Sequence, residues 1–215
     1  GHGGRHSPHE QIDKGADRHR TATVTGSSEM AAESRRVKDT SDIALRDVAA
    51  ADMAAICEIY AHHVIHGLAS WEEIPPDLSE MTRRKDAIVA DGFPYRIAVR
   101  GETVLGYAYV GKYRPRPAYR NTVENSLYVA EAARGLGIGT LLLNDLIEIC
   151  TAQGFRRMVG IVGDSANAAS IGLHEKAGFE MVGVIPACGY KAGQWLDQVL
   201  LHRTLGAGDT QPPEK

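Results

Sequence analysis

Six consecutive residues in the second half of the chain could bind a phosphate group. They are Arg134, Gly135, Leu136, Gly137, Ile138 and Gly139, and they join a segment typical of a strand to an apolar segment typical of a helix. Glycines at the start of a helix let an anion approach backbone N–H groups that have no helical partner, and the helix dipole adds to the attraction. The pattern favours a phosphate or pyrophosphate ligand, although a tight strand-to-helix connection without a ligand would also use glycines.

Two common nucleotide-binding motifs do not fit this segment. A dinucleotide fingerprint would place Gly or Ala three residues after Gly137, where the chain has Thr140. The phosphate loop of an NTPase would need Gly-Lys followed by Ser or Thr, which the segment lacks. The glycines therefore indicate a phosphate-containing ligand of another kind.

A carboxylate lies in the predicted strand that precedes these glycines. Glu124 is on the polar face of residues 121–129, and the opposite face is apolar. Partial desolvation would raise the pKa of this carboxyl toward neutrality, as a general base requires. Glu124 could equally face water or pair with an arginine such as Arg120.

The apolar periodicity, caps and turns predict the elements that position these residues. The predicted strands cover residues 43–46, 95–100, 103–110, 121–129, 157–162, 179–184 and 195–204. The predicted helices are one that Asp52 caps and that ends near His66, one that a capping box at 77–80 opens and that ends near 91, one over 137–153 and one over 167–176. Antiparallel strands followed by a β-α-β-α-β run predict an α/β or α+β fold, with one mixed, mostly antiparallel sheet covered by helices on both faces.

Length and charge exclude several classes of protein. The chain has 215 residues and balances 24 Lys and Arg against 27 Asp and Glu, for a net charge of −3. The length predicts one domain. The charge balance excludes the strong positive field of a nucleic-acid binder. Because no apolar run approaches the ~18 residues of a membrane span, we expect no membrane partner and a cytoplasmic location.

The composition also predicts the limits of the folded part. Residues 1–41 contain many charges and no aromatic residue, so we expect a disordered N-terminal extension, part of which could be a remnant of expression. The globular domain would then cover 42–206, and 207–215 would form a flexible tail.

Cysteine and histidine spacing predicts no metal centre. Cys57, Cys150 and Cys188 are widely spaced without a Cys-x-x-Cys pair, so they are expected to be small buried hydrophobic residues rather than disulfide or zinc ligands. His62 and His66 are four residues apart, but no acidic residue completes a motif such as His-Glu-x-x-His.

Several of these segments together resemble one family. Residues 134–139 are similar to the Arg/Gln-x-x-Gly-x-Gly/Ala pyrophosphate loop of the GNAT acyl-CoA-dependent N-acetyltransferases. Residues 167–170 and 173–179 resemble the late helix of that family, which lies along the pantetheine arm. Residues 69–72, 122–129 and 189–197 resemble the branch that acetylates phosphinothricin and methionine sulfoximine, so the similarity covers 43–204.

The resemblance implies a single-domain GNAT-like fold, acetyl-CoA as cosubstrate, a homodimer, and a set of site residues. Glu124 would be the general base, and the backbone N–H of Val129 would polarise the thioester carbonyl. His174 stands where many GNAT enzymes carry a Tyr that protonates the leaving thiolate; it could donate that proton, contact the cofactor or only pack. The implied cofactor-binding residues are Tyr128, Val129, Arg134, Gly135, Leu136, Gly137, Ile138, Gly139, Thr140, Asn167 and Ser170.

The same resemblance implies an acceptor site for a small amino-acid-like substrate. Arg114, with Arg116, would bind the substrate carboxylate, since an Arg fork suits a carboxylate. Trp71 and Tyr119 would line the side-chain pocket. An ordinary solvated basic loop around Arg114 is the alternative. Lys191 and Trp195 belong to the branch's late segment and could shape either this pocket or a subunit interface.

The expected function is therefore acetyl-CoA-dependent N-acetylation of the α-amine of a phosphinothricin-, methionine sulfoximine- or methionine sulfone-type amino acid. Direct attack in a ternary complex is favoured over a covalent cysteine route. The alternatives are a peptide or protein N-terminal acetyltransferase and a non-catalytic acyl-CoA-binding sensor.

Overall fold

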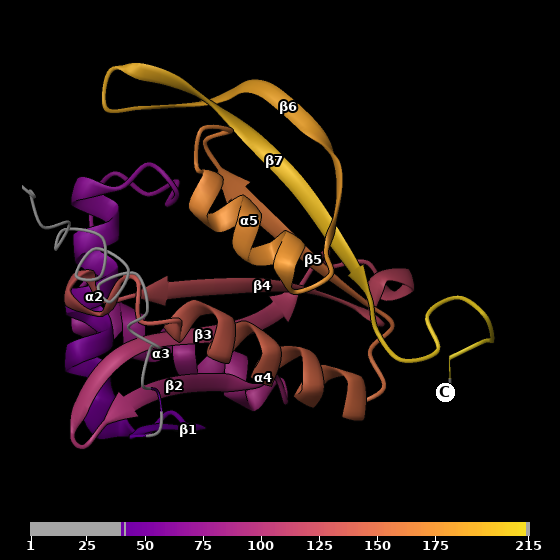
Figure 1. Cartoon of the computed structure of the whole chain (residues 1–215), viewed down its shortest axis with the longest axis horizontal. Coiled ribbons are helices and arrows are strands. Elements are labelled where there is room, and N and C mark those ends of the chain that lie inside the picture. Colours follow the sequence, from indigo (N-terminus) through magenta and orange to yellow (C-terminus); the bar gives the residue numbers. More distant parts are fainter. Residues whose placement is uncertain (1–39, 41, 214–215) are drawn as a thin grey trace, which may run out of the picture. The chain divides into compact units, whose positions relative to one another are not determined.

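The computed structural model in Figure 1 describes residues 40 and 42–213, in which one sheet is flanked by α-helices. The strands are β1 (Ile43–Asp47), β2 (Tyr95–Arg100), β3 (Thr103–Lys112), β4 (Thr122–Val129), β5 (Arg157–Gly163), β6 (Glu180–Lys191) and β7 (Gln194–Thr204). The α-helices are α2 (Met53–His66), α3 (Leu78–Ala90), α4 (Ile138–Ala152) and α5 (Ala168–Lys176). The predicted extension over 1–41 lies outside the described residues, apart from Thr40.

The strand order confirms a mixed, mostly antiparallel sheet. The seven strands are arranged β1-β2-β3-β4-β5-β7-β6. Only β4 and β5 are parallel, because α4 provides the crossover between them that parallel neighbours need. Every other neighbouring pair is antiparallel.

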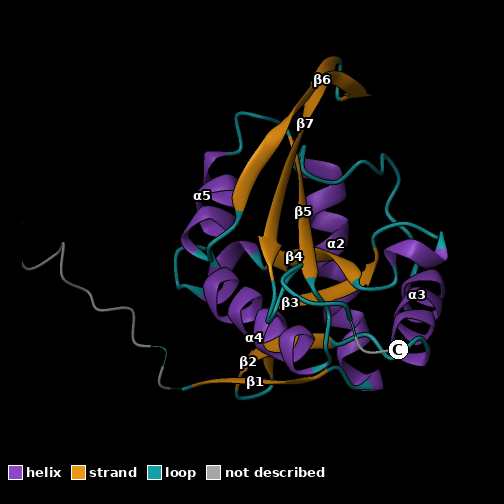
Figure 2. Cartoon of the chain, turned by 90° about the vertical axis from the view of Figure 1, so that its right-hand side faces the viewer, coloured by secondary structure: helices purple, strands orange, loops and turns teal. Residues whose placement is uncertain are grey.

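Helices cover both faces of the sheet, as the sequence predicts. Figure 2 shows α4 and α5 on one side of the strands and α2 and α3 on the other. On α4, Leu142, Leu143 and Leu146 are fully buried in the first core, and on α2, Ile56 is fully buried in the second. None of the described helices is long and apolar enough to cross a membrane.

Stacked tyrosines form much of the core under α2 and α3. The rings of Tyr95 and Tyr107 are 5.8 Å apart, and Tyr107 stacks on Tyr128 at 5.3 Å. Tyr60 of α2 then meets Tyr128 edge-on at 5.0 Å. These interlocked rings form a stiff layer under the end of β4.

Two predicted helix caps differ in detail from the structure. Asp52 does not cap α2: a short 3-10 helix, η1 (Ala50–Asp52), precedes it, so the carboxylate turns back to accept from the Ala49 N–H at 2.6 Å and to pair with Arg46 at 2.8 Å. At α3, Asp77 accepts from the Glu80 N–H at 2.8 Å as predicted. The other half of that capping box does not form, because the Glu80 carboxylate pairs with Arg83 and Arg84.

The last hairpin is longer than the sequence predicts. Strand β6 was expected to end at 184 but continues to Lys191. The continuation passes a bulge at Ala187, whose φ is 48° and whose N–H donates to the Asp197 carboxylate at 2.9 Å. Pro186 does not end the strand, because proline is tolerated at bulges and on edge strands such as β6. Beyond β7, two turns at 205–210 begin the tail, whose flexibility stays a prediction.

Candidate active site

The parallel strands β4 and β5 separate halfway along their length. Their pairing runs from Thr122 and Arg157 to Asn125 and Gly160 and then stops. Beyond this point β4 pairs only with β3, and β5 only with β7, and the strands diverge (Figure 1). The sheet therefore contains a split between the second half of β4 and the second half of β5.

Backbone amides of β4 line one edge of this split. The Ala130 N–H donates to the Leu105 carbonyl at 2.9 Å, so these residues form a hydrogen-bonded pair of the β3–β4 ladder. Because such pairs alternate in antiparallel strands, Leu127 and Val129 direct their N–H and C=O groups away from β3. His63 confirms this direction, since its Nε2 donates to the Val129 carbonyl at 2.9 Å. The Val129 N–H thus faces the split, where it could bind a developing oxyanion.

The split opens into a cavity of about 280 Å³ that five of the predicted site residues line together with ten others. From the prediction these are Trp71, Glu124, Tyr128, Ser170 and His174. They come from the loop after α2, from β4 and from α5. Groups that are far apart in the sequence therefore face one small volume.

Burial and one arginine act in opposite directions on Glu124. Desolvation raises the pKa of its carboxyl, and the positive charge of Arg114 partly lowers it. Among the described residues none hydrogen-bonds to or pairs with this carboxylate; Arg120, the alternative partner, donates instead to the Pro117 carbonyl at 3.2 Å. A half-buried carboxylate of raised pKa inside a cavity is suited to accept a proton.

His174 closes the α5 side of the split. Its Nδ1 lies 2.8 Å from the Ser170 carbonyl, and its Nε2 lies 3.1 Å from Asn125 Oδ1. The Asn125 amide donates to the Val159 carbonyl at 2.9 Å, which holds Oδ1 toward the ring. Burial lowers the pKa of His174. A neutral ring has one N–H, so it can donate to only one of these two oxygens.

Gly160 makes this position of the ring possible. A Cβ at residue 160 would lie 2.7 Å from Cδ2 of His174. Any side chain there would therefore push the imidazole away from β5. This glycine belongs to the last β4–β5 pair and lets α5 approach the split closely.

The glycine-rich segment has the backbone that the sequence predicts. Gly135 and Gly137 have φ of 78° and 86°, and Gly137 is the N-cap of α4. A Cβ on Gly135 would meet no atom within 4 Å, so the space beside it is open. Gly139 differs, because a Cβ there would lie 3.1 Å from Cδ2 of Leu173, so the absence of a side chain makes room for α5. The start of α4 is thus an open cradle of N–H groups suited to a pyrophosphate.

The other predicted cofactor residues surround this cradle. Arg134 pairs with Glu131 at 2.9 Å and is half exposed, and Thr140 is exposed on the first turn of α4. The Ile138 side chain is buried in the core and Leu136 packs against it, so these two offer only backbone groups. Asn167 caps α5 by accepting from the Ser170 N–H at 3.1 Å.

The predicted acceptor residues divide into two groups. Trp71 lines the cavity, and the positive charge of Arg114 acts to lower the pKa of Glu124. Arg116 and Tyr119 are exposed and do not line the cavity; Tyr119 packs edge-on against Tyr113 at 5.8 Å. The structure therefore brings Trp71 to the site and places Arg114 near it.

Neither thiol chemistry nor a metal cluster is indicated at this site. Burial raises the pKa of Cys57, whose thiol donates to the Pro76 carbonyl, and raises that of Cys150 to about 12. The prediction that all three cysteines are buried is wrong for Cys188, which is exposed on β6 and is not among the cavity residues. Within residues 40 and 42–213 no three His, Cys, Asp or Glu side chains are placed to hold a metal ion.

Comparison with known proteins identifies the family. Residues 55–179, more than half of the chain, match the family described as the acetyltransferase (GNAT) family. This chain belongs to the GNAT acetyltransferases. It is therefore an acyltransferase enzyme, with the split sheet and the glycine cradle in one domain.

Individual relatives of this GNAT enzyme have related activities. It is 50% identical over 163 residues to a phosphinothricin N-acetyltransferase of Alcaligenes faecalis, covering 76% of this chain and 83% of that protein. It is 42% identical over 170 residues to an L-methionine sulfoximine/L-methionine sulfone acetyltransferase of Pseudomonas paraeruginosa, covering 78% and 98%. The crystal structure of a Sinorhizobium meliloti phosphinothricin acetyltransferase with AcCoA superposes with a TM-score of 0.78 and 43% identity, covering 81% and 94%.

Sequence reasoning missed several residues that line the GNAT cavity. Asn125 is the clearest, because it is a buried polar residue on the otherwise apolar face of β4, and that interruption was a readable signal. Tyr60, Ser70 and Glu72 also line the cavity. They come from α2 and the following loop, from which the sequence analysis selects Trp71 alone.

Proposed function

We propose that this GNAT enzyme transfers the acetyl group of acetyl-CoA to the α-amine of a small amino acid of the phosphinothricin, methionine sulfoximine or methionine sulfone type. The observation that carries the proposal is the cavity at the β4–β5 split, where a half-buried Glu124 faces the same volume as Trp71 and His174. The activities named for the two relatives support this substrate class.

Glu124 activates the acceptor in this proposal. An α-ammonium group has no lone pair, so it must lose a proton before nitrogen can attack. The Glu124 carboxylate takes that proton, directly or through one water, and the raised pKa of its carboxyl makes it a stronger base than an exposed glutamate. The neutral amine then attacks the thioester carbon directly within a ternary complex.

Backbone groups and His174 serve the acyl donor. Acetyl-CoA supplies the activated acetyl group, and the open cradle at Gly135 and the first turn of α4 fit its pyrophosphate. The Val129 N–H hydrogen-bonds to the thioester oxygen as negative charge develops there. As the C–S bond breaks, the attacking nitrogen loses its second proton and the thiolate sulfur gains one, and in this proposal the neutral His174 ring, which lines the cavity, relays that proton by accepting it at one nitrogen and donating from the other.

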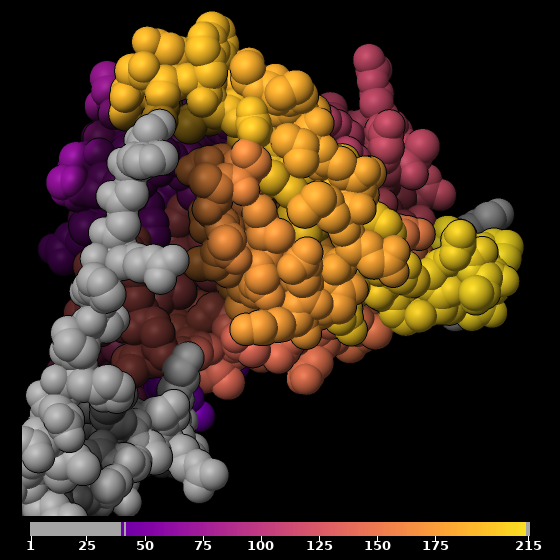
Figure 3. Space-filling model, turned by 45° about the horizontal axis from the view of Figure 1, so that its top comes forward, coloured from indigo at the N-terminus to yellow at the C-terminus, as the bar shows by residue number. Residues whose placement is uncertain are grey.

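We also propose that two chains associate through β6. This edge strand is exposed along most of its length on both faces, with Met181, Val182, Val184 and Ile185 each 44–56% exposed. Figure 3 shows the hairpin of β6 and β7 as a broad part of the molecular surface. An apolar edge strand of this kind is suited to pack against the same strand of a second chain. The cytoplasmic location stays a prediction.

A thiol-release assay with acetyl-CoA tests the function. Methionine sulfoximine, methionine sulfone, phosphinothricin, ordinary amino acids and short peptides are compared by kcat/KM. We expect the first three to be preferred over short peptides by at least about tenfold, because a carboxylate-binding arginine would have no partner in a peptide's N-terminal residue. Preference for peptides would support an N-terminal acetyltransferase, and binding of acetyl-CoA without turnover would support a sensor.

A further inference from the structure

A buried lysine ties the end of the last hairpin to the loop that carries Trp71. Lys191, the final residue of β6, is only 6% exposed. Its Nζ donates to the Gly67 carbonyl at 2.9 Å and to the Ser70 carbonyl at 2.8 Å. These bonds join residues more than 120 positions apart and cross-link β6 to the 67–73 loop.

The same face of β6 receives the Trp71 ring. Side chains alternate along a strand, so Gly189 and Lys191 face the same side. A Cβ on Gly189 would lie 2.0 Å from Cζ3 of Trp71, which means that the indole rests directly on the backbone of β6. Gly163 at the end of β5 also lies close to the loop, because a Cβ there would be 3.1 Å from the Leu68 carbonyl oxygen.

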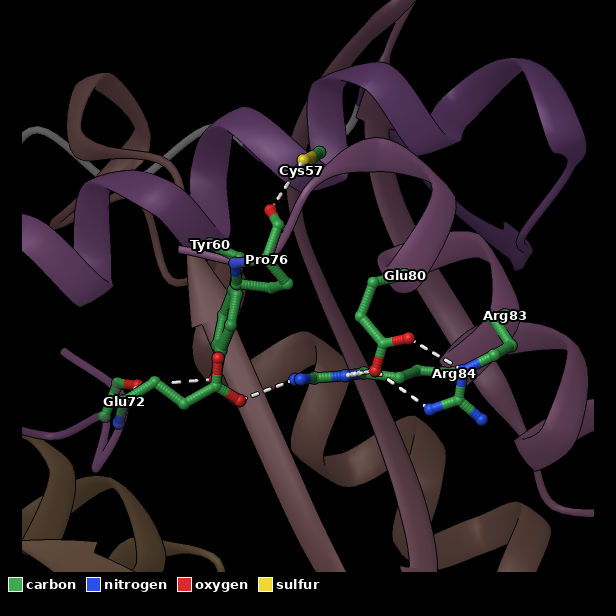
Figure 4. A network of polar contacts seen from close by, with 8 residues as sticks. Cys57, Tyr60, Glu72, Pro76, Glu80, Arg83 and Arg84 are labelled. Carbon is green, nitrogen blue, oxygen red and sulfur yellow. Dashed lines mark hydrogen bonds and ion pairs between the residues drawn. The ribbon is translucent and has the colours of Figure 1, made fainter. Parts of the chain in front are cut away.

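Two further contacts hold the loop from the other side. Ser70 Oγ lies 3.3 Å from the Tyr60 hydroxyl of α2. Glu72 pairs with Arg84 of α3 at 2.5 Å, and Arg84 also binds Glu80 (Figure 4). The loop is thus held by β6, α2 and α3, and its Ser70, Trp71 and Glu72 line the cavity that holds Glu124.

From these contacts we infer that Lys191 is a positioning residue and Gly189 a specificity-determining residue of the acceptor site. Lys191 fixes the main chain of the 67–73 loop, and Gly189 leaves the space in which the Trp71 ring stands as the wall of the acceptor pocket. This inference rests on the proposed function only for the identity of the ligand beside Trp71.

The burial of this charge argues for positioning rather than for stability. Removing an ammonium group from water is costly, and burial lowers the pKa of Lys191 although Glu73 and Glu72 act against that shift. An apolar side chain of similar length would fill the same space without this cost. What it could not do is bind two loop carbonyls at once.

The first test uses fluorescence and needs no turnover. The chain has two tryptophans, so a Trp195→Phe background leaves Trp71 as the reporter. In this background Lys191→Met should raise the acrylamide quenching constant of Trp71 by about twofold, because the loop loses an attachment. Lys112→Met, which removes a lysine that pairs with Asp91, is the matched control and should leave quenching unchanged.

The second test measures the acceptor and donor sites separately in the otherwise native enzyme. Lys191→Met and Gly189→Ala should each raise KM for the preferred amino acid by about tenfold and change KM for acetyl-CoA by less than about twofold. Gly189→Ala keeps the inference testable if Lys191→Met does not fold.

Two outcomes would overturn the inference. One is unchanged quenching of Trp71 in the Lys191→Met variant, and the other is an equal change in both KM values. If the parent enzyme acetylated no amino acid, the proposed function would fail, and the quenching experiment would still decide whether Lys191 holds the loop.

Discussion

At the scale of single residues, the proposed chemistry depends on an environment that keeps the Glu124 carboxylate ionised and also raises its basicity. Burial raises the pKa of Glu124, and Arg114 limits the rise. Full burial without a nearby cation would leave the carboxyl protonated, whereas full exposure would make it a weak base. The intermediate environment keeps the carboxylate charged and makes it a stronger base than an exposed glutamate.

Replacing Glu124 by Gln should separate catalysis from binding. We expect kcat to fall by about 10²–10⁴ because the base is lost, while calorimetry shows unchanged affinity for acetyl-CoA. The melting temperature should rise at neutral pH. A carboxyl with a raised pKa contributes stability that is present below its unfolded-state pKa and lost as pH rises through the folded-state value, and Gln avoids that loss. Turnover equal to that of the parent enzyme would remove Glu124 from the mechanism.

Arg114→Ala should affect both the pH profile and acceptor binding. Removing the positive charge raises the pKa of Glu124 further, so the acid limb of kcat/KM should move to higher pH. KM for the amino acid should rise more than KM for acetyl-CoA, because the α-carboxylate of the substrate loses the arginine proposed to bind it. Arg120→Ala is the control, since that guanidinium binds the Pro117 carbonyl. An unmoved acid limb with equal changes in both KM values would contradict this role.

At the scale of elements, the site arises where regular structure ends. The β4–β5 pairing stops at Asn125 and Gly160, and α4 begins at a left-handed glycine. Both places leave backbone N–H groups without partners in the strand or helix. Such groups bind developing negative charge or phosphate without the need for a charged side chain.

Gly135→Ala tests the cradle at the start of α4. The added methyl enters the open space beside the loop and forces a left-handed φ of 78° on alanine. Gly92→Ala is a matched control, because Gly92 has φ of 81° and is equally open but follows α3. Both variants should lose about 1 kcal/mol of folding free energy. Only Gly135→Ala should weaken acetyl-CoA binding, by about tenfold in calorimetry; equal affinities in the two variants would exclude this role.

At the scale of the whole molecule, β6 stands out because it has a neighbouring strand on one side only. It is an edge strand, and its apolar residues are exposed on both faces. Association through this strand would also stiffen the hairpin that contacts Trp71. Assembly and the acceptor site would then be mechanically connected.

Val182→Lys tests the assembly. Val182 is 56% exposed on β6, and a lysine there should abolish pairing, so that light scattering after gel filtration gives the mass of one chain instead of two. Val89→Lys, at a 49% exposed site on α3, should leave the mass at two chains. A parent protein that elutes with the mass of one chain would refute the homodimer.

Much of this architecture could be predicted because its signals are local. Helical periodicity around Leu142 and Leu146, alternation through 122–129 and the glycines before α4 each act over a few residues. They predict the elements, the sheet type and the phosphate cradle. A carboxylate in the middle of a strand also makes Glu124 a candidate, but the resemblance to the GNAT family was needed to favour it as the base over a solvated or paired residue.

The sequence by itself determined the elements and the chemical types of the central residues, because hydrophobic periodicity and backbone preferences depend on near neighbours. Only the tertiary structure decided which residues meet. It placed Asn125 against His174, Gly189 under Trp71 and Lys191 on the Ser70 carbonyl. Those contacts depend on where β4 and β5 separate and how the last hairpin folds back, and these are results of packing the whole chain.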